Sequence, residues 1–396
     1  MKSEESWGRL DMRSNWDVKR LDEIAEFNPR ETIKKGSVAK KIAMDVLQPF
    51  TRDVPSFEVT EFKGGTKFRN GDTIMARITP CLENGKTAKV SILNEDEVGF
   101  GSTEYIVFRP KEVTDEDYLY YLVCSPTVRE PAIKSMVGSS GRQRVQTDVV
   151  KGLEIPVPPY EEQIKIGKLL KDLDDKIKLN TEINKNLEQQ AIALYKANFI
   201  DFVPYDGKMP SSWRQGTVSE IIEIHDSKRI PLSNRERSDL DKIYPYYGAT
   251  SIMDYVDKYL FDGIYLLLAE DGTVMDDRGY PILQYVEGKF WVNNHAHILT
   301  GKNGYTVELL YLLFKLTNVK SIITGAVQLK ISQANLRNLS VVIPTQADLR
   351  EIDAIIQPLF SEIRNLRAEN QRLSAIRDSL LPKLMSGELD ISEVDI

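Results

Sequence analysis

Residues 155–198 read IPVPPYEEQIKIGKLLKDLDDKIKLNTEINKNLEQQAIALYKAN, and their apolar positions recur at alternating steps of four and three. This heptad spacing is typical of a long helix that pairs with another helix. The same spacing returns in a second run that starts at Ile352. The matching positions are Ile166, Leu170, Leu173, Ile177, Asn180, Asn184, Leu187, Ala191, Leu194 and Asn198, then Ile352, Ile356, Leu359, Ile363, Leu366, Asn370, Leu373, Arg377, Leu380 and Leu384. The pattern predicts two long helices, the first from Tyr160 to Asn198.

Both helices have sequence signals at their ends. A proline pair at 158–159 precedes the first helix, and glutamates at 161–162 suit the positive end of its dipole. The second helix follows Thr345-Gln346-Ala347-Asp348, which resembles a capping box. Gly387 is a suitable residue to end it. These signals support helices that start and stop at defined residues.

Three asparagines occupy core positions of the two heptad runs, namely Asn180, Asn184 and Asn370. A buried asparagine costs stability but fixes the register of paired helices. Since a large module separates the two helices in the sequence, an antiparallel pair is the simplest arrangement. Asn180 would then lie opposite Asn370. We therefore expect these asparagines to set the register of an antiparallel coiled coil.

The repeat extends beyond the helices. Trp16, Leu21 and Ile24 share their spacing with Trp213, Val218 and Ile221. Both modules then carry segments rich in β-branched and aromatic residues, which predict strands. The predicted strands are Asp72–Ile78, Lys86–Leu93 and Thr103–Phe108, then Gly263–Ala269, Ile282–Val286 and Ala296–Leu299; a short helix follows each set, at Asp117–Val123 and Val307–Leu316.

The fold class that follows is α+β. We expect two similar α+β modules, separated by two long helices that form an antiparallel coiled coil, with an internal pseudo-twofold repeat. The predicted segments are residues 1–157 for the first module, 158–202 for the central helix, 203–343 for the second module, and 344–396 for the last helix and tail.

Composition narrows the class of protein. The 396 residues are 41% hydrophobic and 28% charged, as in soluble folded proteins. The chain has no run of eighteen apolar residues, and its polar N-terminus does not resemble a signal peptide, so we expect a cytoplasmic protein. The net charge is −7, and residues 1–150 carry 23 Lys and Arg against 24 Asp and Glu. If DNA is the ligand, partners should supply much of the phosphate neutralisation.

Catalytic and metal motifs are missing from the sequence. Val157-Pro158-Pro159-Tyr160 resembles the Asp/Asn-Pro-Pro-Tyr motif of amino-methyltransferases, but Val157 cannot accept a hydrogen bond from an amine. No glycine-rich cofactor loop or Walker A sequence is present, and the two cysteines have no metal-ligand spacing. His295 and His297 should share one face of a strand, without a third ligand in view. We expect no catalytic residue, no cofactor and no metal in this chain.

Several loops are instead rich in side chains that can read bases. Arginine fits guanine with two hydrogen bonds, asparagine and glutamine fit adenine, and serine or threonine serve either. The candidate DNA-binding residues are Arg77, Thr79, Asn84, Lys86, Ser102, Thr103, Ser139, Ser140, Arg142, Gln143 and Arg144 in the first module, and Tyr246, Tyr247, Thr250, Ser251, Asn293, Asn294, His295, Gln328 and Lys330 in the second.

Three functions remain compatible with the residues alone. The chain could be a DNA-reading scaffold without catalytic activity, a self-contained DNA methyltransferase, or a coiled-coil adaptor between two proteins. The missing cofactor loop argues against the methyltransferase. Polar loops occur in every protein, so composition alone does not separate the other two.

A resemblance separates them. The chain resembles the specificity (S) subunit of Type I restriction–modification systems over nearly its whole length. IPVPPYEEQIKI, VIPTQADLREI and RDSLLPKLMSGELDI resemble the conserved helical regions of that family. ARITPCLENGK, GFGSTEYIVFRP and SGRQRV resemble one type of target recognition domain, and the YPYYGATSIMDYVDKYLFDGIYLLLAEDG and NNHAHIL segments resemble another. One departure is Thr345-Gln346-Ala347, where the family has a proline pair and an acidic helix start.

The resemblance implies a function. Each module would read one half of a bipartite target in double-stranded DNA, and the paired helices would set the gap between the halves. The helices would also bind two methyltransferase (modification) subunits, which carry S-adenosylmethionine and methylate adenine N6. Restriction subunits that use ATP and Mg²⁺ would join the larger complex.

Overall fold

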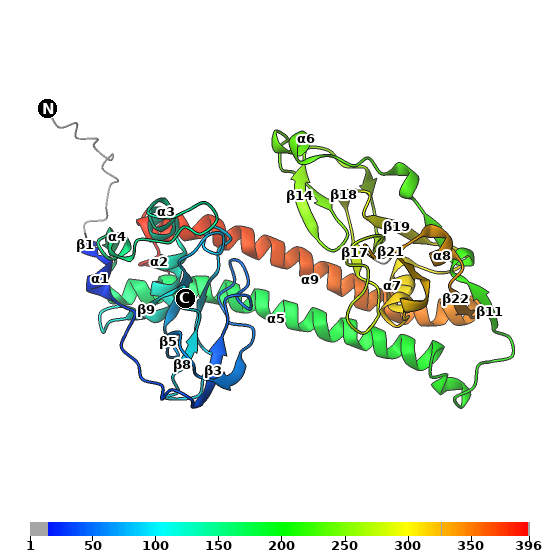
Figure 1. Cartoon of the computed structure of the whole chain (residues 1–396), viewed down its shortest axis with the longest axis horizontal. Helices are drawn as coiled ribbons and strands as arrows, with labels where there is room; N and C mark the ends of the chain where they lie inside the picture. Colours follow the sequence, from blue (N-terminus) through cyan, green and yellow to red (C-terminus); the bar gives the residue numbers. More distant parts are fainter. Residues whose placement is uncertain (1–14, 326, 395–396) are drawn as a thin grey trace. The chain divides into compact units, whose positions relative to one another are not determined.

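The computed structural model describes residues 15–325 and 327–394, and the chain divides into two compact units (Figure 1). Unit 1 contains residues 1–180 and 368–396, and unit 2 contains residues 181–367. The N-terminal stretch up to residue 14, used above for the localisation, lies outside the described residues. The units do not follow the predicted segment boundaries, because each takes part of both long helices.

The two long helices are α5 (Tyr160–Phe199) and α9 (Gln346–Ser386), with 40 and 41 residues. The end signals act as expected: the amide of Asp348 donates to Thr345 Oγ1 at 3.3 Å, and Gly387 adopts a φ of 75°. Neither these helices nor any other described helix combines the length and the apolar character that crossing a membrane requires.

The segments of α5 and α9 in unit 1 are antiparallel. Ile166 and Leu170, near the start of α5, share a core with Leu384 at the end of α9. Further along α5, the side-chain amide of Asn180 donates to Asn370 Oδ1 at 2.9 Å. Residue numbers therefore increase along α5 in the direction in which they decrease along α9. This confirms the antiparallel pairing and the position of Asn180 opposite Asn370.

The described part of unit 1 contains three sheets. A strand pair joins the start of the module to its end, and two four-stranded sheets lie between them in the sequence. In hydrogen-bonding order, the sheets are β1 (Asp17–Arg20) with β10 (Glu154–Val157); β2 (Ala25–Phe27), β9 (Tyr105–Pro110), β6 (Thr73–Ala76) and β7 (Thr87–Lys89); and β4 (Glu58–Glu61), β3 (Val38–Ile42), β8 (Gly99–Gly101) and β5 (Thr66–Phe68). The helices are α1 (Leu21–Ile24), α2 (Glu116–Cys124), α3 (Pro126–Lys134) and α4 (Thr147–Lys151).

Unit 2 repeats these strand orders. The matching sheets are β11 (Arg214–Thr217) with β22 (Ser340–Ile343); β12 (Ile222–Ile224), β19 (Ala296–Gly301), β16 (Tyr265–Ala269) and β17 (Leu283–Val286); and β14 (Ile252–Val256), β13 (Tyr244–Tyr247), β18 (Lys289–Val292) and β15 (Phe261–Asp262). A further pair joins β20 (Ile323–Thr324) to β21 (Lys330–Ile331). The helices are α6 (Asn234–Ser238), α7 (Val307–Lys315) and α8 (Gln333–Arg337).

The duplication predicted from the spacing is visible in single hydrogen bonds. The indole of Trp16 donates to Glu162 at 3.1 Å, and the indole of Trp213 donates to Asp348 at 2.7 Å. Glu162 and Asp348 both lie in the first turn of a long helix, one turn before the first residue of the matching heptad runs. Each unit therefore fastens its opening tryptophan to the same position of a long helix.

Candidate nucleic-acid interface

Three loops of unit 1 that carry candidate DNA-binding residues converge in space. They are residues 77–86 after β6, residues 102–104 before β9, and residues 138–145 between α3 and α4. The amide of Arg77 donates to the carbonyl of Glu104 at 2.9 Å, and the amide of Thr79 donates to the carbonyl of Gln143 at 3.0 Å. These backbone bonds bring together residues that are distant in the sequence and make one surface from the three loops.

Glu104 is the centre of this surface. Its carboxylate accepts hydrogen bonds from Arg144 Nε at 2.9 and 3.0 Å and from Arg144 Nη2 at 2.7 Å. Arg77 Nε lies 3.9 Å from the same carboxylate. The guanidinium of Arg144 holds the pKa of Glu104 below its usual range. Glu104 is thus a fixed anion between two arginines, a role that the sequence did not predict.

The remaining candidates of unit 1 differ in how free their side chains are. Thr79 Oγ1 donates to Glu83 at 2.8 Å, and Lys86 Nζ donates to the backbone carbonyl of Met44 at 2.8 Å. Ser102 Oγ accepts the amide hydrogen of Glu104, and Gln143 is half-buried. The exposed candidates are Asn84, Thr103, Ser139, Ser140, Arg142 and Arg144.

Four loops of unit 2 converge in a similar way. They are residues 248–251 after β13, residues 270–273 after β16, residues 293–295 before β19, and the loop that contains Leu329 before β21. The amide of Glu270 donates to the carbonyl of His295 at 2.9 Å, and the amide of Gly272 donates to the carbonyl of Leu329 at 3.0 Å. A recess with a volume of about 320 Å³ is lined by residues 248–251, 271–273 and 295, which belong to three of these loops, and by Met253. Its lining consists of Gly248, Ala249, Thr250, Ser251, Met253, Asp271, Gly272, Thr273 and His295.

Two candidates of unit 2 are buried, and we remove them from the interface. Tyr246 is 1% exposed, and its hydroxyl is bonded to the backbone of Leu232. Asn293 is 4% exposed, and its Oδ1 accepts the amide hydrogen of His295 at 2.8 Å. Both side chains are held by backbone hydrogen bonds and are not available on the surface. The exposed candidates are Thr250, Ser251, Asn294, Gln328 and Lys330, while Tyr247 and His295 are half-buried.

The expectation that His295 and His297 share a strand face is wrong. β19 begins at Ala296, so His295 precedes the strand, where its Nδ1 lies 2.6 Å from Asp271. His297 lies within β19 and is fully buried. Its Nδ1 lies 2.6 Å from Asp226, and its Nε2 lies 2.8 Å from the carbonyl of Ile331.

The surroundings of His297 form an ion network. Asp226, Glu270 and His297 could offer three ligand atoms within 4.8 Å of one another, a group that does not include His295 and that the sequence did not predict. The donors of the network already engage both carboxylates, however: Arg229 bonds Glu270 at 2.7 Å, and Gln333 bonds Asp226 at 2.6 Å. Burial raises the pKa of Asp226, but the hydrogen bonds from His297 and the Ile298 amide, together with the charges of His297 and Arg229, lower it overall. The network ties β19 to β21 and to the loop that follows β16.

The asparagines predicted to set the register differ from one another. Asn180 is fully buried and bonds both Glu369, at 2.8 Å, and Asn370. Asn370 in turn donates to the carbonyl of Ile177 at 3.1 Å. Asn184 Oδ1 is buried and accepts no hydrogen bond from the described residues. The pair of Asn180 and Asn370 therefore has the geometry of a register lock, and that geometry is not shown for Asn184.

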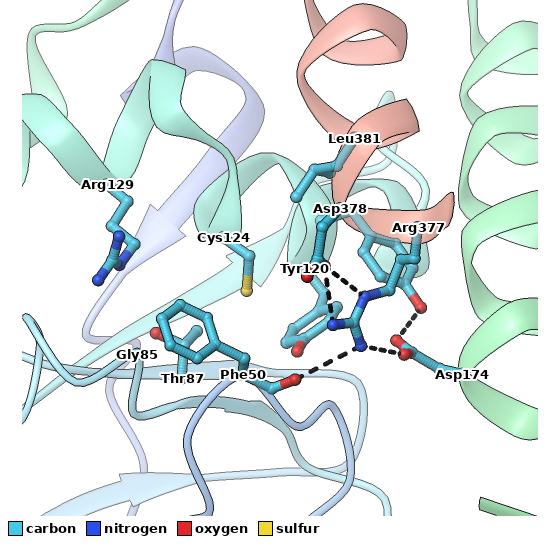
Figure 2. Close-up of a pocket in the computed structure, with 11 residues that line it drawn as sticks. Phe50, Gly85, Thr87, Tyr120, Cys124, Arg129, Asp174, Arg377, Asp378 and Leu381 are labelled. Atoms are coloured by element: carbon cyan, nitrogen blue, oxygen red, sulfur yellow. Dashed lines mark hydrogen bonds and ion pairs between the residues drawn. The ribbon is translucent and has the colours of Figure 1, made fainter. Parts of the chain in front are cut away.

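Arg377 is a functional candidate that sequence reasoning passed over. It occupies a heptad core position but is paired with Asp174 of α5 at 2.6 Å, and it reaches the carbonyl of Phe50 at 3.5 Å (Figure 2). Tyr121 donates to the same carboxylate at 2.6 Å. Arg377 thus connects both long helices of unit 1 to the body of its module. A charged residue in an apolar heptad position was the available signal.

Two α+β units with matching strand orders, each with its own cluster of loops rich in exposed polar side chains, are consistent with a DNA-specificity protein. The family described as Type I restriction modification DNA specificity domain matches the chain twice, over residues 13–189 and 210–375. The chain therefore belongs to the specificity subunits of Type I restriction–modification systems.

Individual relatives agree with this family. The chain is 28% identical over 316 residues to the Type I restriction enzyme MjaIX specificity subunit of Methanocaldococcus jannaschii, covering 72% of each chain. It is 22% identical over 413 residues to the HindI specificity subunit of Haemophilus influenzae, covering 81% of this chain and 87% of that one. Its fold is similar to that of a Type I S subunit from M. genitalium, with a TM-score of 0.55, 17% identity, and coverage of 99% and 100% of the two chains.

Proposed function

We propose that each unit reads one half of a bipartite target in double-stranded DNA. The observation that supports this most directly is the duplication of the loop clusters. In unit 1, the loop after β6 contacts the loop just before α4. In unit 2, the loop after β16 contacts the residues just before β21 and α8. Equivalent loops at equivalent places suit two related half-sites. Exposed Arg, Asn, Gln, Ser and Thr side chains in these clusters are the types that contact base edges.

We propose further that the chain itself performs no catalysis. Two methyltransferase subunits would bind along α5 and α9 and transfer methyl groups from S-adenosylmethionine to adenine N6. Restriction subunits that need ATP and Mg²⁺ would join that complex. The near-balanced charge of residues 1–150, with 23 basic and 24 acidic side chains, supports partners that contribute phosphate contacts.

The exchange of one module tests the two-reader proposal. In cells that express the chain with its methyltransferase partners, genome-wide methylation sequencing should give a split motif with a non-specific gap. Replacing residues 213–340 with the corresponding module of a relative should change one half only. A change in both halves, or a methylated motif without a gap, would contradict the proposal.

The long helices are proposed to set the gap. Deleting one heptad from each helix removes about 10.5 Å of helix, at ~1.5 Å per residue. This corresponds to about three base pairs at ~3.4 Å each, so the gap should shorten by that amount. Inserting one heptad into each helix should lengthen the gap by the same amount. An active complex with an unchanged gap would disprove the proposal that the long helices set the gap.

Two measurements distinguish the other functions. Calorimetry of the purified chain with S-adenosylmethionine should show no binding, whereas saturable binding would support a self-contained methyltransferase. Partner capture before and after nuclease treatment, combined with a DNA-binding assay of the complex, tests the adaptor. A complex that forms but never binds DNA would favour the adaptor.

A further inference from the structure

The salt bridge at the centre of the unit 1 surface leaves one edge of an arginine available. Arg144 uses Nε and Nη2 to hold the carboxylate of Glu104, which is the side-on arrangement of a guanidinium. A guanidinium has five N–H donors in a fixed plane. The end-on edge, formed by Nη1 and the second hydrogen of Nη2, is not used by any bond of the described residues. The Arg144 side chain is 46% exposed.

We propose that Arg144 reads a guanine in the half-site of unit 1, and that Glu104 is the positioning residue that aims it. Two parallel N–H donors on a rigid plane match the O6 and N7 acceptors of guanine in the major groove. Adenine presents a donor in place of O6, so the same edge discriminates against it. This inference rests on the proposed function and assigns a base to one residue of that surface.

The pairing with Glu104 favours a base contact over a phosphate contact. A phosphate contact derives its strength from an uncompensated positive charge and the release of counterions. The carboxylate of Glu104 neutralises much of that charge. The same carboxylate, only 23% exposed and flanked by Arg77 at 3.9 Å, restricts the rotation of the Arg144 plane. Restricted geometry is what a bidentate base contact needs.

Unit 2 offers an internal contrast. Lys330 occupies the position of the repeat that matches Arg144, and it also borders its loop cluster, with its Nζ 3.2 Å from Glu270. An ammonium group is a point charge without a planar fork, so it cannot make the same two parallel bonds. We therefore expect the two half-sites to differ in base preference at the position that Arg144 contacts in one and Lys330 borders in the other.

Substitutions in the full chain, assembled with its methyltransferase partners, test the assignment. Methylation sequencing should show one fixed G·C pair in the half-site that the module exchange assigns to unit 1. Arg144→Gln and Arg144→Lys should both relax that pair alone, with discrimination falling about tenfold to a hundredfold. Glu104→Gln should lower discrimination at the same G·C pair less strongly, because Arg144 remains but its guanidinium plane is no longer fixed by the Glu104 carboxylate.

Lys134→Gln is the matched control, since it removes one positive charge from an exposed site on α3. It should leave all base preferences unchanged. Unaltered recognition of the unit 2 half-site shows that each variant is folded. If Arg144→Gln does not assemble, Arg144→Lys, which keeps the charge beside Glu104, decides the matter.

Three results would overturn the proposal. The unit 1 half-site could contain no fixed G·C pair, or Arg144→Lys could keep full discrimination. A uniform loss of affinity for all sequences, with a salt dependence lower by about one counterion, would instead identify a phosphate contact. A wild-type complex without a split motif would disprove the proposed function itself, which distinguishes that failure from a failure of the Arg144 assignment alone.

Discussion

At the scale of single residues, the pairing of Glu104 with Arg144 determines what both can do. The sequence predicted Arg144 as a DNA-binding residue from its type and its loop. It could not predict that Glu104, 40 positions earlier, holds two of its donors. That pairing depends on the contact of two loops, which neither loop encodes alone. The sequence therefore predicted which residue types these loops carry, whereas it could not predict their geometry.

The pair makes a prediction about acid titration. The pKa of Glu104 is lowered mainly by its hydrogen bond to Arg144, so this bond stabilises the fold above the unfolded pKa of glutamate. The stabilisation is lost as the pH falls through the lowered pKa. Arg144→Gln should raise the pKa of Glu104 toward its ordinary value, as followed by NMR of the side-chain carboxyl.

Glu97 provides the control for this titration. Burial raises its pKa, but hydrogen bonds from Asn94 and Lys40 lower it overall, and none of these involves Arg144. Its titration should not move in the Arg144→Gln variant. Equal shifts of Glu104 and Glu97 would indicate a general change in the unit, and an unmoved Glu104 would contradict the pairing.

The asparagine pair makes a second prediction at this scale. Asn370→Leu removes both the acceptor of the Asn180 amide and the donor to Ile177, and Asn180 is fully buried. A buried polar group that loses its hydrogen-bond partner should lower the free energy of unfolding by about 1–3 kcal/mol. The double variant Asn180→Leu/Asn370→Leu should recover that loss, because both polar groups are gone. Urea unfolding of both variants measures this, and a double variant that is no more stable than Asn370→Leu would refute it.

At the scale of elements, the long helices were the most predictable part. Their heptads and caps are local signals, and the predicted start and end of α5 are correct to one residue. The six predicted strands are also present, with bounds shifted by a few positions. The second four-stranded sheet of each unit was missed. Its strands have two to five residues, and its central pairing is parallel, as where Lys41 lies opposite Phe100. No local periodicity marks such distant, short pairings.

The start of α9 makes a prediction about helix capping. Asp348 accepts hydrogen bonds from Thr345 and from the indole of Trp213, and the bond from Thr345 contributes most to its lowered pKa. Asp348→Ala should reduce the unfolding free energy by about 1–2 kcal/mol, because it removes the reciprocal bond of the capping pair. Thermal unfolding measures the loss.

A control variant removes charge from the same turns. Glu351→Ala deletes an exposed carboxylate of α9 close to the same end of the helix. It should change stability by no more than about 0.5 kcal/mol. Similar losses in both variants would mean that the helix dipole, and not the bonds to Thr345 and Trp213, explains the effect.

At the scale of the whole molecule, the two units are built from different parts of the chain. Unit 2 is continuous from residue 181 to residue 367, while unit 1 joins residues 1–180 to residues 368–396. Leu384, Met385 and Ile391 are buried in the core of unit 1. The constant offset between the two heptad runs revealed the duplication in the sequence. It could not reveal this division, because the matching heptads give no preference for which segment completes which core.

Truncation tests the division. A chain that ends at residue 367 lacks Leu384, Met385 and Ile391, and burying such side chains contributes about 1.5–3 kcal/mol each. Hydrogen exchange should therefore show strong loss of protection in unit 1, with the strands of unit 2 still protected. A chain that ends at residue 392 keeps these three side chains and should resemble the full protein. Equal loss of protection in both units of the shorter chain would contradict the division.

This division also determines the order in which the units can close during synthesis. About 200 residues separate Asn180 from Leu384, and ribosomes add roughly 5–20 residues each second. The nascent chain must carry the unfinished core of unit 1 for about 10–40 seconds at that rate, and all of unit 2, residues 181–367, is synthesised during this interval. The module that is translated first is therefore completed last, and the final helix of the chain closes it.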